Sequence, residues 1–121
     1  MKRILIIDDE EMMRGMLRQL LEREGYEVVD AADGAEGLNI HGRHPVELVI
    51  TDLIMPDKEG LETILEFKQN YPDVKVIAMS GGGKIGPDNY LNLAEKFGAQ
   101  CTLTKPFLMK DVLEAVGQLL N

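Results

Sequence analysis

Residues 4–9 are Ile4-Leu5-Ile6-Ile7-Asp8-Asp9, four apolar residues followed directly by two aspartates. A short apolar run that ends in charge is typical of a buried strand in a parallel sheet. Two more runs have this form, because residues 46–51 precede Asp52 and residues 101–104 precede Lys105. Ligands of open parallel sheets bind at the edge formed by the carboxyl ends of the strands, so we expect these charged residues to meet there.

The rest of the chain alternates between predicted strands and helices. Strands are predicted at residues 3–8, 26–31, 46–51, 74–79 and 101–104. Helices are predicted at 10–24, 35–41, 61–68 and 87–97, and a last one is marked by Val112, Leu113, Val116, Leu119 and Leu120. This alternation indicates an α/β fold with a parallel sheet, right-handed crossovers and helices on both faces. We expect one domain over residues 1–121.

Single residues outside these strand ends are assigned structural roles. The methionines of the first predicted helix, Met12, Met13 and Met16, are interpreted as core filling, since they follow helical spacing. His41 and His44 lie around a helix end, where we expect surface residues. Cys101 is interpreted as a small core residue.

Composition excludes several classes of protein. The 121 residues are 45% hydrophobic, which argues against disorder, and the net charge of −8 disfavours direct binding to nucleic acid or anionic lipid. A single cysteine cannot form an internal disulfide, and no apolar run approaches the roughly 20 residues of a membrane span. The amino terminus enters a strand at once and leaves no room for a signal peptide. We therefore expect a cytoplasmic domain with no membrane contact.

The four charged residues at the predicted strand ends define a chemical site. Asp8, Asp9 and Asp52 would repel one another if all three were ionised in a dry environment, and a hard cation would relieve this repulsion. Mg²⁺ prefers such oxygen ligands and is often shared with phosphate oxygens. A carboxylate can accept a phosphoryl group, and Lys105 could neutralise its oxygens. The set therefore suits a divalent cation together with a phosphoryl group.

The chain resembles the receiver domains of two-component response regulators along its whole length. Four motifs carry the resemblance: residues 5–10, residues 52–56 with Gly60, Ser80-Gly81, and Lys105-Pro106-Phe107. The resemblance implies a doubly wound five-stranded parallel sheet of order 2-1-3-4-5, in a flavodoxin-like three-layer sandwich.

The same resemblance implies a role for each residue of the site. Asp52 would accept a phosphoryl group from a phosphohistidine of a sensor histidine kinase or phosphotransfer protein. Mg²⁺ would be bound by Asp9, Asp52 and the backbone carbonyl of Ile54, with Asp8 acting mainly through water. Lys105 and the Ser80 hydroxyl would contact the phosphoryl oxygens. The domain would catalyse only its own phosphorylation and dephosphorylation, and would switch conformation to control an output domain or effector protein, as a monomer or a phosphorylation-dependent homodimer.

Three features depart from the family pattern. The family usually has an aromatic residue three positions before the lysine, and here Thr102 stands there. The segment from Ser80 to Lys105 is longer than usual, and we expect its three glycines at 81–83 to form a mobile loop. Ile54 is apolar where many relatives are polar, so we expect it to restrict attacking water and lengthen the life of the phosphorylated state.

Three other readings compete with the phosphoryl-accepting domain. A pseudo-receiver would act only as a protein–protein interaction module, and Thr102 keeps this alternative open. An aspartyl-phosphate hydrolase of the haloacid dehalogenase type would need a second aspartate where Ile54 stands. A flavodoxin-type flavin carrier would need a Ser/Thr- and Gly-rich phosphate loop where the acidic residues 8–11 stand.

Overall fold

The computed structural model describes residues 2–53, 60–80 and 94–121, which form a parallel β-sheet with helices on both faces. Its elements are β1 (Arg3–Ile7), α1 (Glu11–Arg23), β2 (Glu27–Ala31), α2 (Gly34–Arg43), β3 (Leu48–Asp52), α3 (Gly60–Asn70), β4 (Lys75–Ser80), β5 (Cys101–Thr104) and α5 (Met109–Leu120). The strand order is β2-β1-β3-β4-β5, and all four pairings are parallel. The predicted α/β fold and strand order are therefore confirmed.

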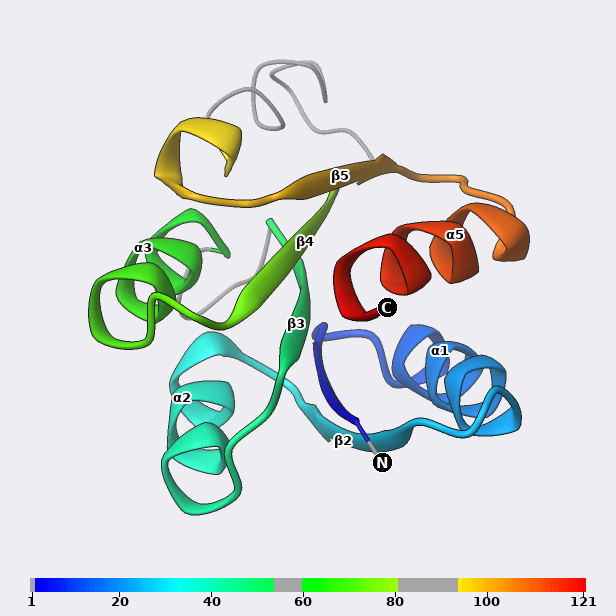
Figure 1. Cartoon of the computed structure of the whole chain (residues 1–121), viewed down its shortest axis with the longest axis horizontal. Coiled ribbons are helices and arrows are strands. Elements are labelled where there is room, and N and C mark those ends of the chain that lie inside the picture. Colours follow the sequence, from blue (N-terminus) through cyan, green and yellow to red (C-terminus); the bar gives the residue numbers. More distant parts are fainter. Residues whose placement is uncertain (1, 54–59, 81–93) are drawn as a thin grey trace.

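The sheet separates two layers of helices (Figure 1). Helices α2 and α3 cover one face, and α1 and α5 cover the other. Alternate residues of the central strands pack into these layers, because side chains of a strand point to opposite faces. In β1, Leu5 and Ile7 join the core under α2 and α3, whereas Ile4 and Ile6 join the core under α1 and α5. Each fully buried Leu or Ile contributes roughly 1.5–3 kcal/mol of transfer free energy.

Most predicted boundaries agree with the observed ones to within a few residues. Asp33, predicted as part of a turn, is the N-cap of α2, and its side chain accepts a hydrogen bond from the Glu36 amide at 2.9 Å. Asp52 is the last residue of β3 and does not follow the strand. The helix predicted to open at Pro87 lies mostly outside the described residues, of which 94–97 are helical.

Two residue assignments are wrong. Met12 is 87% exposed, whereas Met13 and Met16 pack against the core as expected. The buried stripe of α1 centres on Leu17, Leu20 and Leu21, and Met12 lies beside that stripe in the first helical turn. Only two of the three methionines therefore fill the core.

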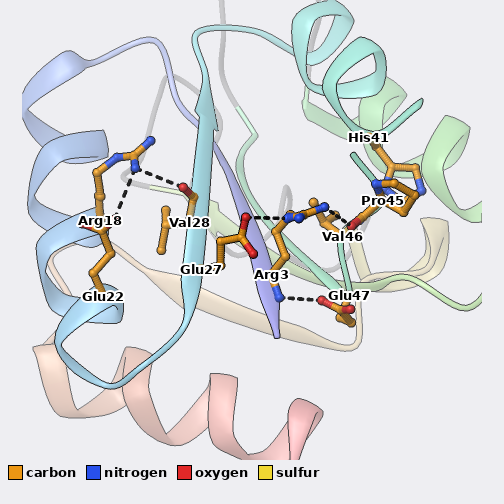
Figure 2. Close-up of polar contacts among 9 residues, drawn as sticks. All are labelled: Arg3, Arg18, Glu22, Glu27, Val28, His41, Pro45, Val46 and Glu47. Carbon is orange, nitrogen blue, oxygen red and sulfur yellow. Dashed lines mark hydrogen bonds and ion pairs between the residues drawn. The ribbon is translucent and has the colours of Figure 1, made fainter. Parts of the chain in front are cut away.

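His41 is buried, contrary to the expectation of a surface residue. Its ring makes edge contacts with Phe67 and Tyr71 of the α3 region, at centroid distances of 5.6 and 4.2 Å. Its Nδ1 accepts a hydrogen bond of 3.0 Å from the Val46 amide (Figure 2). His44 is exposed, and Cys101 is half-buried against the core, as expected.

Polar contacts of Arg3 link the amino-terminal ends of three strands, β1, β2 and β3, at one edge of the sheet (Figure 2). The Arg3 guanidinium contacts Glu27 at 3.1 Å and donates to the Pro45 carbonyl at 3.1 Å, and the Arg3 amide donates to the Glu47 carboxylate. Such partly exposed contacts contribute up to about 1 kcal/mol each. The charged residues of the predicted site lie at the opposite edge, where the strands end.

Among residues 2–53, 60–80 and 94–121, the structure contains no helix with the length and apolar character of a membrane span.

Candidate functional site

Three carboxylates and one ammonium group meet at the carboxyl edge of the sheet. Asp8 follows β1, Asp52 ends β3 and Lys105 follows β5. One carboxylate oxygen from each of Asp8, Asp9 and Asp52 lies within 4.8 Å of the others. The Lys105 Nζ donates to Asp8 Oδ2 at 3.2 Å and to Asp52 Oδ2 at 3.1 Å. The parallel register brings these residues together, because neighbouring strands end side by side.

Asp8 is fully buried, and its polar groups are held by four contacts. Its amide donates to the Ala31 carbonyl at 3.1 Å, and its Oδ1 accepts from the Glu10 amide at 2.9 Å. Its Oδ2 accepts from Lys105, and its carbonyl accepts from Arg14 Nη1 at 2.8 Å. Asp9, the next residue, is exposed. The turn after β1 therefore places one carboxylate inside the site and the next at its mouth.

The proton affinities at this site reflect burial and mutual charge. Burial raises the pKa of Asp8 above its usual 3.8, and the Asp52 charge adds to this, whereas the Glu10 amide and Lys105 act against it. Burial tends to lower the pKa of Lys105, but the charges of Asp52 and Asp8 outweigh burial, so the pKa lies above its usual 10.5. Lys105 is therefore a permanent cation at neutral pH.

Asp52 is positioned by main-chain packing on both sides. The adjacent Leu53 amide donates to the Met79 carbonyl of β4 at 3.0 Å. On the other side, the start of α3 touches the Asp52 backbone, where a Cβ built on Gly60 would lie 2.1 Å from the Asp52 carbonyl oxygen. Only glycine fits there without a shift of the backbone.

Ser80 ends β4 beside the lysine. Its carbonyl accepts a hydrogen bond of 2.8 Å from the Lys105 amide. Its Oγ is buried and has no hydrogen-bond partner among the residues that the structure describes. A buried hydroxyl without a partner is uncommon, and this one can donate to an acceptor that enters the site.

Two further expectations about the site have different outcomes. Ile54, the expected carbonyl ligand, lies outside the described residues, as do the glycines 81–83. Thr102 is half-buried on β5 opposite Ala78, so a small hydroxyl side chain lies at the position where the resemblance leads us to expect a ring. The peptide bond between Lys105 and Pro106 is cis.

The donor set fits a hard divalent cation. All three side chains offer carboxylate oxygens at mutual distances that one ion can span, and the buried position of Asp8 disfavours uncompensated negative charge. Asp8, Asp9 and Asp52 could therefore hold a metal ion, beside the Lys105 ammonium that hydrogen-bonds to both Asp8 and Asp52.

Sequence reasoning missed Arg14 and the reason for Gly60. Arg14 lies six residues after Asp8, inside a helix, and no motif marks it as part of the site. Gly60 belongs to the motif that carries the resemblance, but its contact with the Asp52 backbone depends on how α3 packs.

Comparison with known proteins identifies the family of the chain. Residues 4–117 match the family model of the response regulator receiver domain. The chain is 33% identical to the chemotaxis protein CheY of Halobacterium salinarum, covering 99% of this chain and 98% of that one, and 35% identical to the chemotaxis protein CheY of Bacillus subtilis, covering 98% of both. It also superposes on the crystal structure of the response regulator protein TrrA of Thermotoga maritima in complex with Mg(2+)-BeF. That match has a TM-score of 0.87 and 33% identity, and it covers 99% of this chain and 100% of that one. With this sheet order, this acidic edge and this match, the chain belongs to the response regulator receiver domain family.

Proposed function

We propose that this domain accepts a phosphoryl group on Asp52 from a phosphohistidine of a sensor histidine kinase or phosphotransfer protein, in a Mg²⁺-dependent reaction. The observation that carries the proposal is the meeting of Asp8, Asp9, Asp52 and Lys105 at one edge of the sheet. Membership of the receiver family supports it, as does the similarity to TrrA, whose structure is a complex with Mg(2+)-BeF.

The transfer is a displacement at phosphorus. A carboxylate oxygen of Asp52 forms the new P–O bond while the P–N bond of the phosphohistidine breaks, and the imidazole leaves with the electron pair of that bond. Lys105 now shares its ammonium between Asp52 and Asp8. It would move from the Asp52 oxygen to a phosphoryl oxygen, and this exchange keeps the buried charge compensated.

The metal would be held by Asp9, Asp52 and the Ile54 carbonyl, with Asp8 acting through water. Bound Mg²⁺ would supply positive charge in addition to that of Lys105 and so reduce the repulsion between the carboxylates and the incoming phosphoryl oxygens.

Ser80 offers the means to sense the modification. Its buried Oγ would donate to a phosphoryl oxygen on Asp52, because phosphorylation adds about −1.5 to −2 of charge and three strong acceptors. The Ser80 carbonyl accepts a hydrogen bond from the Lys105 amide. A shift of Ser80 would therefore also move Lys105, at the start of the connection between β5 and α5. We propose that this biases two conformations and thereby controls an output domain or effector protein.

The same proposal includes the extent of the domain, its location in the cell, its oligomeric state and the range of its chemistry. Residues 1–121 act as one receiver domain in the cytoplasm, as a monomer or a phosphorylation-dependent homodimer. The domain does not bind nucleic acid directly, and its chemistry is limited to its own phosphorylation and dephosphorylation.

The test is to incubate the purified chain with Mg²⁺ and acetyl phosphate and to record its intact mass. We expect a gain of one phosphoryl group that is absent with EDTA and absent in Asp52→Asn. Asp73→Asn, which removes a carboxylate at the opposite edge of the sheet, is the matched control and should label as the wild type does.

Wild-type protein that stays unmodified would overturn the proposal and favour the pseudo-receiver. Continuous release of inorganic phosphate far in excess of the protein, without accumulated label, would point instead to a phosphatase.

A further inference from the structure

We propose that Arg14 is a positioning residue of the metal site, because it fixes the peptide plane between Asp8 and Asp9. This inference rests on the proposed metal-dependent function. Arg14 lies in the first turns of α1, and its Nη1 donates to the Asp8 carbonyl oxygen at 2.8 Å.

The bond acts on both aspartates at once. The carbonyl of Asp8 and the amide of Asp9 belong to one planar unit, so anchoring the oxygen fixes the direction in which the chain enters Asp9. The Asp8 amide and both of its carboxylate oxygens are already held, by Ala31, Glu10 and Lys105. The Arg14 bond supplies the fourth contact, and it holds the peptide unit that leads into the exposed Asp9.

The start of α1 shows why a side chain from inside the helix is needed. Glu10 is the N-cap residue, but its side chain makes no cap hydrogen bond. The N-cap residue therefore supplies no side-chain cap, and the side-chain contacts at this helix start come from Asp8, whose Oδ1 accepts from the Glu10 amide, and from Arg14. The Arg14 amide closes the first helical turn onto the Glu10 carbonyl at 3.1 Å, and the Arg14 side chain reaches back across this turn to Asp8.

The choice of acceptor matters for the metal. Lys105 bonds to carboxylate oxygens, whereas Arg14 bonds to a main-chain oxygen. Arg14 therefore brings a positive charge to the acidic edge through a contact that uses no carboxylate lone pair of Asp8 or Asp9. Groups that orient metal ligands in this way typically change metal affinity by 10–100-fold when removed.

Arg18 provides a matched control on the same helix. It is half-buried like Arg14, and its Nη1 also donates to a backbone carbonyl, that of Val28, at 3.0 Å (Figure 2). Its further contacts are with Glu22 and Asp30, neither of which is a residue of the candidate site. Arg18→Gln therefore removes a similar bond between helix and main chain without touching the site.

The experiment measures the Mg²⁺ dissociation constant of the full chain by titration calorimetry, for the wild type, Arg14→Gln and Arg18→Gln. Unfolding in urea with EDTA measures the stability of each. We expect Arg14→Gln to weaken Mg²⁺ binding about tenfold and Arg18→Gln to leave it within about twofold, although both lose stability. The backbone amide resonances of Asp9 and Glu10 should shift in the Arg14 variant alone.

Arg14→Lys distinguishes the effect of the hydrogen-bond geometry from the effect of the positive charge. It also replaces Arg14→Gln in the experiment if the glutamine variant does not fold. It keeps the positive charge and loses the planar donor group, so it too should weaken Mg²⁺ binding. Wild-type affinity in either Arg14 variant would overturn the positioning role while the proposed function stands. A wild-type chain that binds no Mg²⁺ would overturn both.

Discussion

At the scale of single residues, the absence of a side chain at Gly60 decides how closely α3 approaches Asp52, the proposed phosphoryl acceptor. The Gly60 amide donates to the Leu53 carbonyl at 3.0 Å, and a Cβ would collide with backbone atoms of Asp52 and Leu53. Backbone cannot rotate away as a flexible side chain can. An added methyl group must therefore displace either the helix or the end of β3.

We predict opposite effects of alanine at two glycines. Gly60→Ala should destabilise the fold by about 1–3 kcal/mol, because it forces backbone shifts in a packed region. Gly15→Ala, in α1 with open space around its Cβ position, should stabilise it by up to about 1 kcal/mol. Urea unfolding of both variants checks the pair, and equal stability of Gly60→Ala and the wild type would contradict the close approach.

Asp8 allows a second prediction at this scale. Its pKa is raised in the fold, chiefly by burial, so the ionised carboxylate opposes folding. The stability that this group contributes is present below pH 3.8 and is lost as the pH rises through the raised folded value. In EDTA at pH 7, Asp8→Asn should therefore unfold at higher urea concentration than the wild type. A lower midpoint would show that the pair with Lys105 outweighs the cost of burying the charge.

At the scale of elements, His41 joins α2 to α3 and to the entry of β3. The ring packs against both Phe67 and Tyr71, and its Nδ1 accepts from the Val46 amide, which requires an unprotonated nitrogen. Burial lowers the pKa of His41 below its usual 6.5. Protonation therefore breaks the contact that leads the chain from α2 into β3.

The expected pH dependence has a definite sign. Because the folded pKa is lowered, the contribution of His41 is complete above pH 6.5 and is lost as the pH falls through the folded value. His41→Asn offers an oxygen near the place of Nδ1 and removes the titration. It should cost about 1–3 kcal/mol of packing and abolish the stability loss in this window. Urea unfolding tests this between pH 7.5 and 5, from about one unit above the ordinary pKa to about 1.5 units below it, because the folded pKa lies on the low side.

His44→Gln is the control, since it removes an exposed histidine near the same helix end and leaves the buried ring of His41 in place. If the slope followed His44 instead, the assignment to the buried ring would be wrong.

At the scale of the whole molecule, the net charge of −8 and the acidic edge both favour the binding of cations to the folded protein. Any ion that binds the folded state alone stabilises it, by about 2.7 kcal/mol at a hundredfold excess over the dissociation constant. We predict this gain for Mg²⁺ with the wild type and its loss in Asp9→Asn, measured by urea unfolding. Asp73→Asn should keep the gain.

Screening has to be separated from specific binding, because salt relieves self-repulsion in an acidic protein. The reference is therefore NaCl at the same ionic strength. A gain that NaCl reproduces in full would contradict a metal site.

The local pattern of the sequence determined the architecture and the members of the site. Strand and helix periods, and the charges directly after apolar runs, are local properties, and the parallel register then brings Asp8, Asp9, Asp52 and Lys105 to one edge. The motifs added the strand order through the family resemblance. Tertiary packing decided the features that depend on contacts between elements. These are the exposure of Met12, the burial of His41, the hydrogen bond from Arg14 to Asp8, and the contact of Gly60 with Asp52. None of these follows from spacing along the chain, because each is set by the angle and depth at which a helix packs on the sheet.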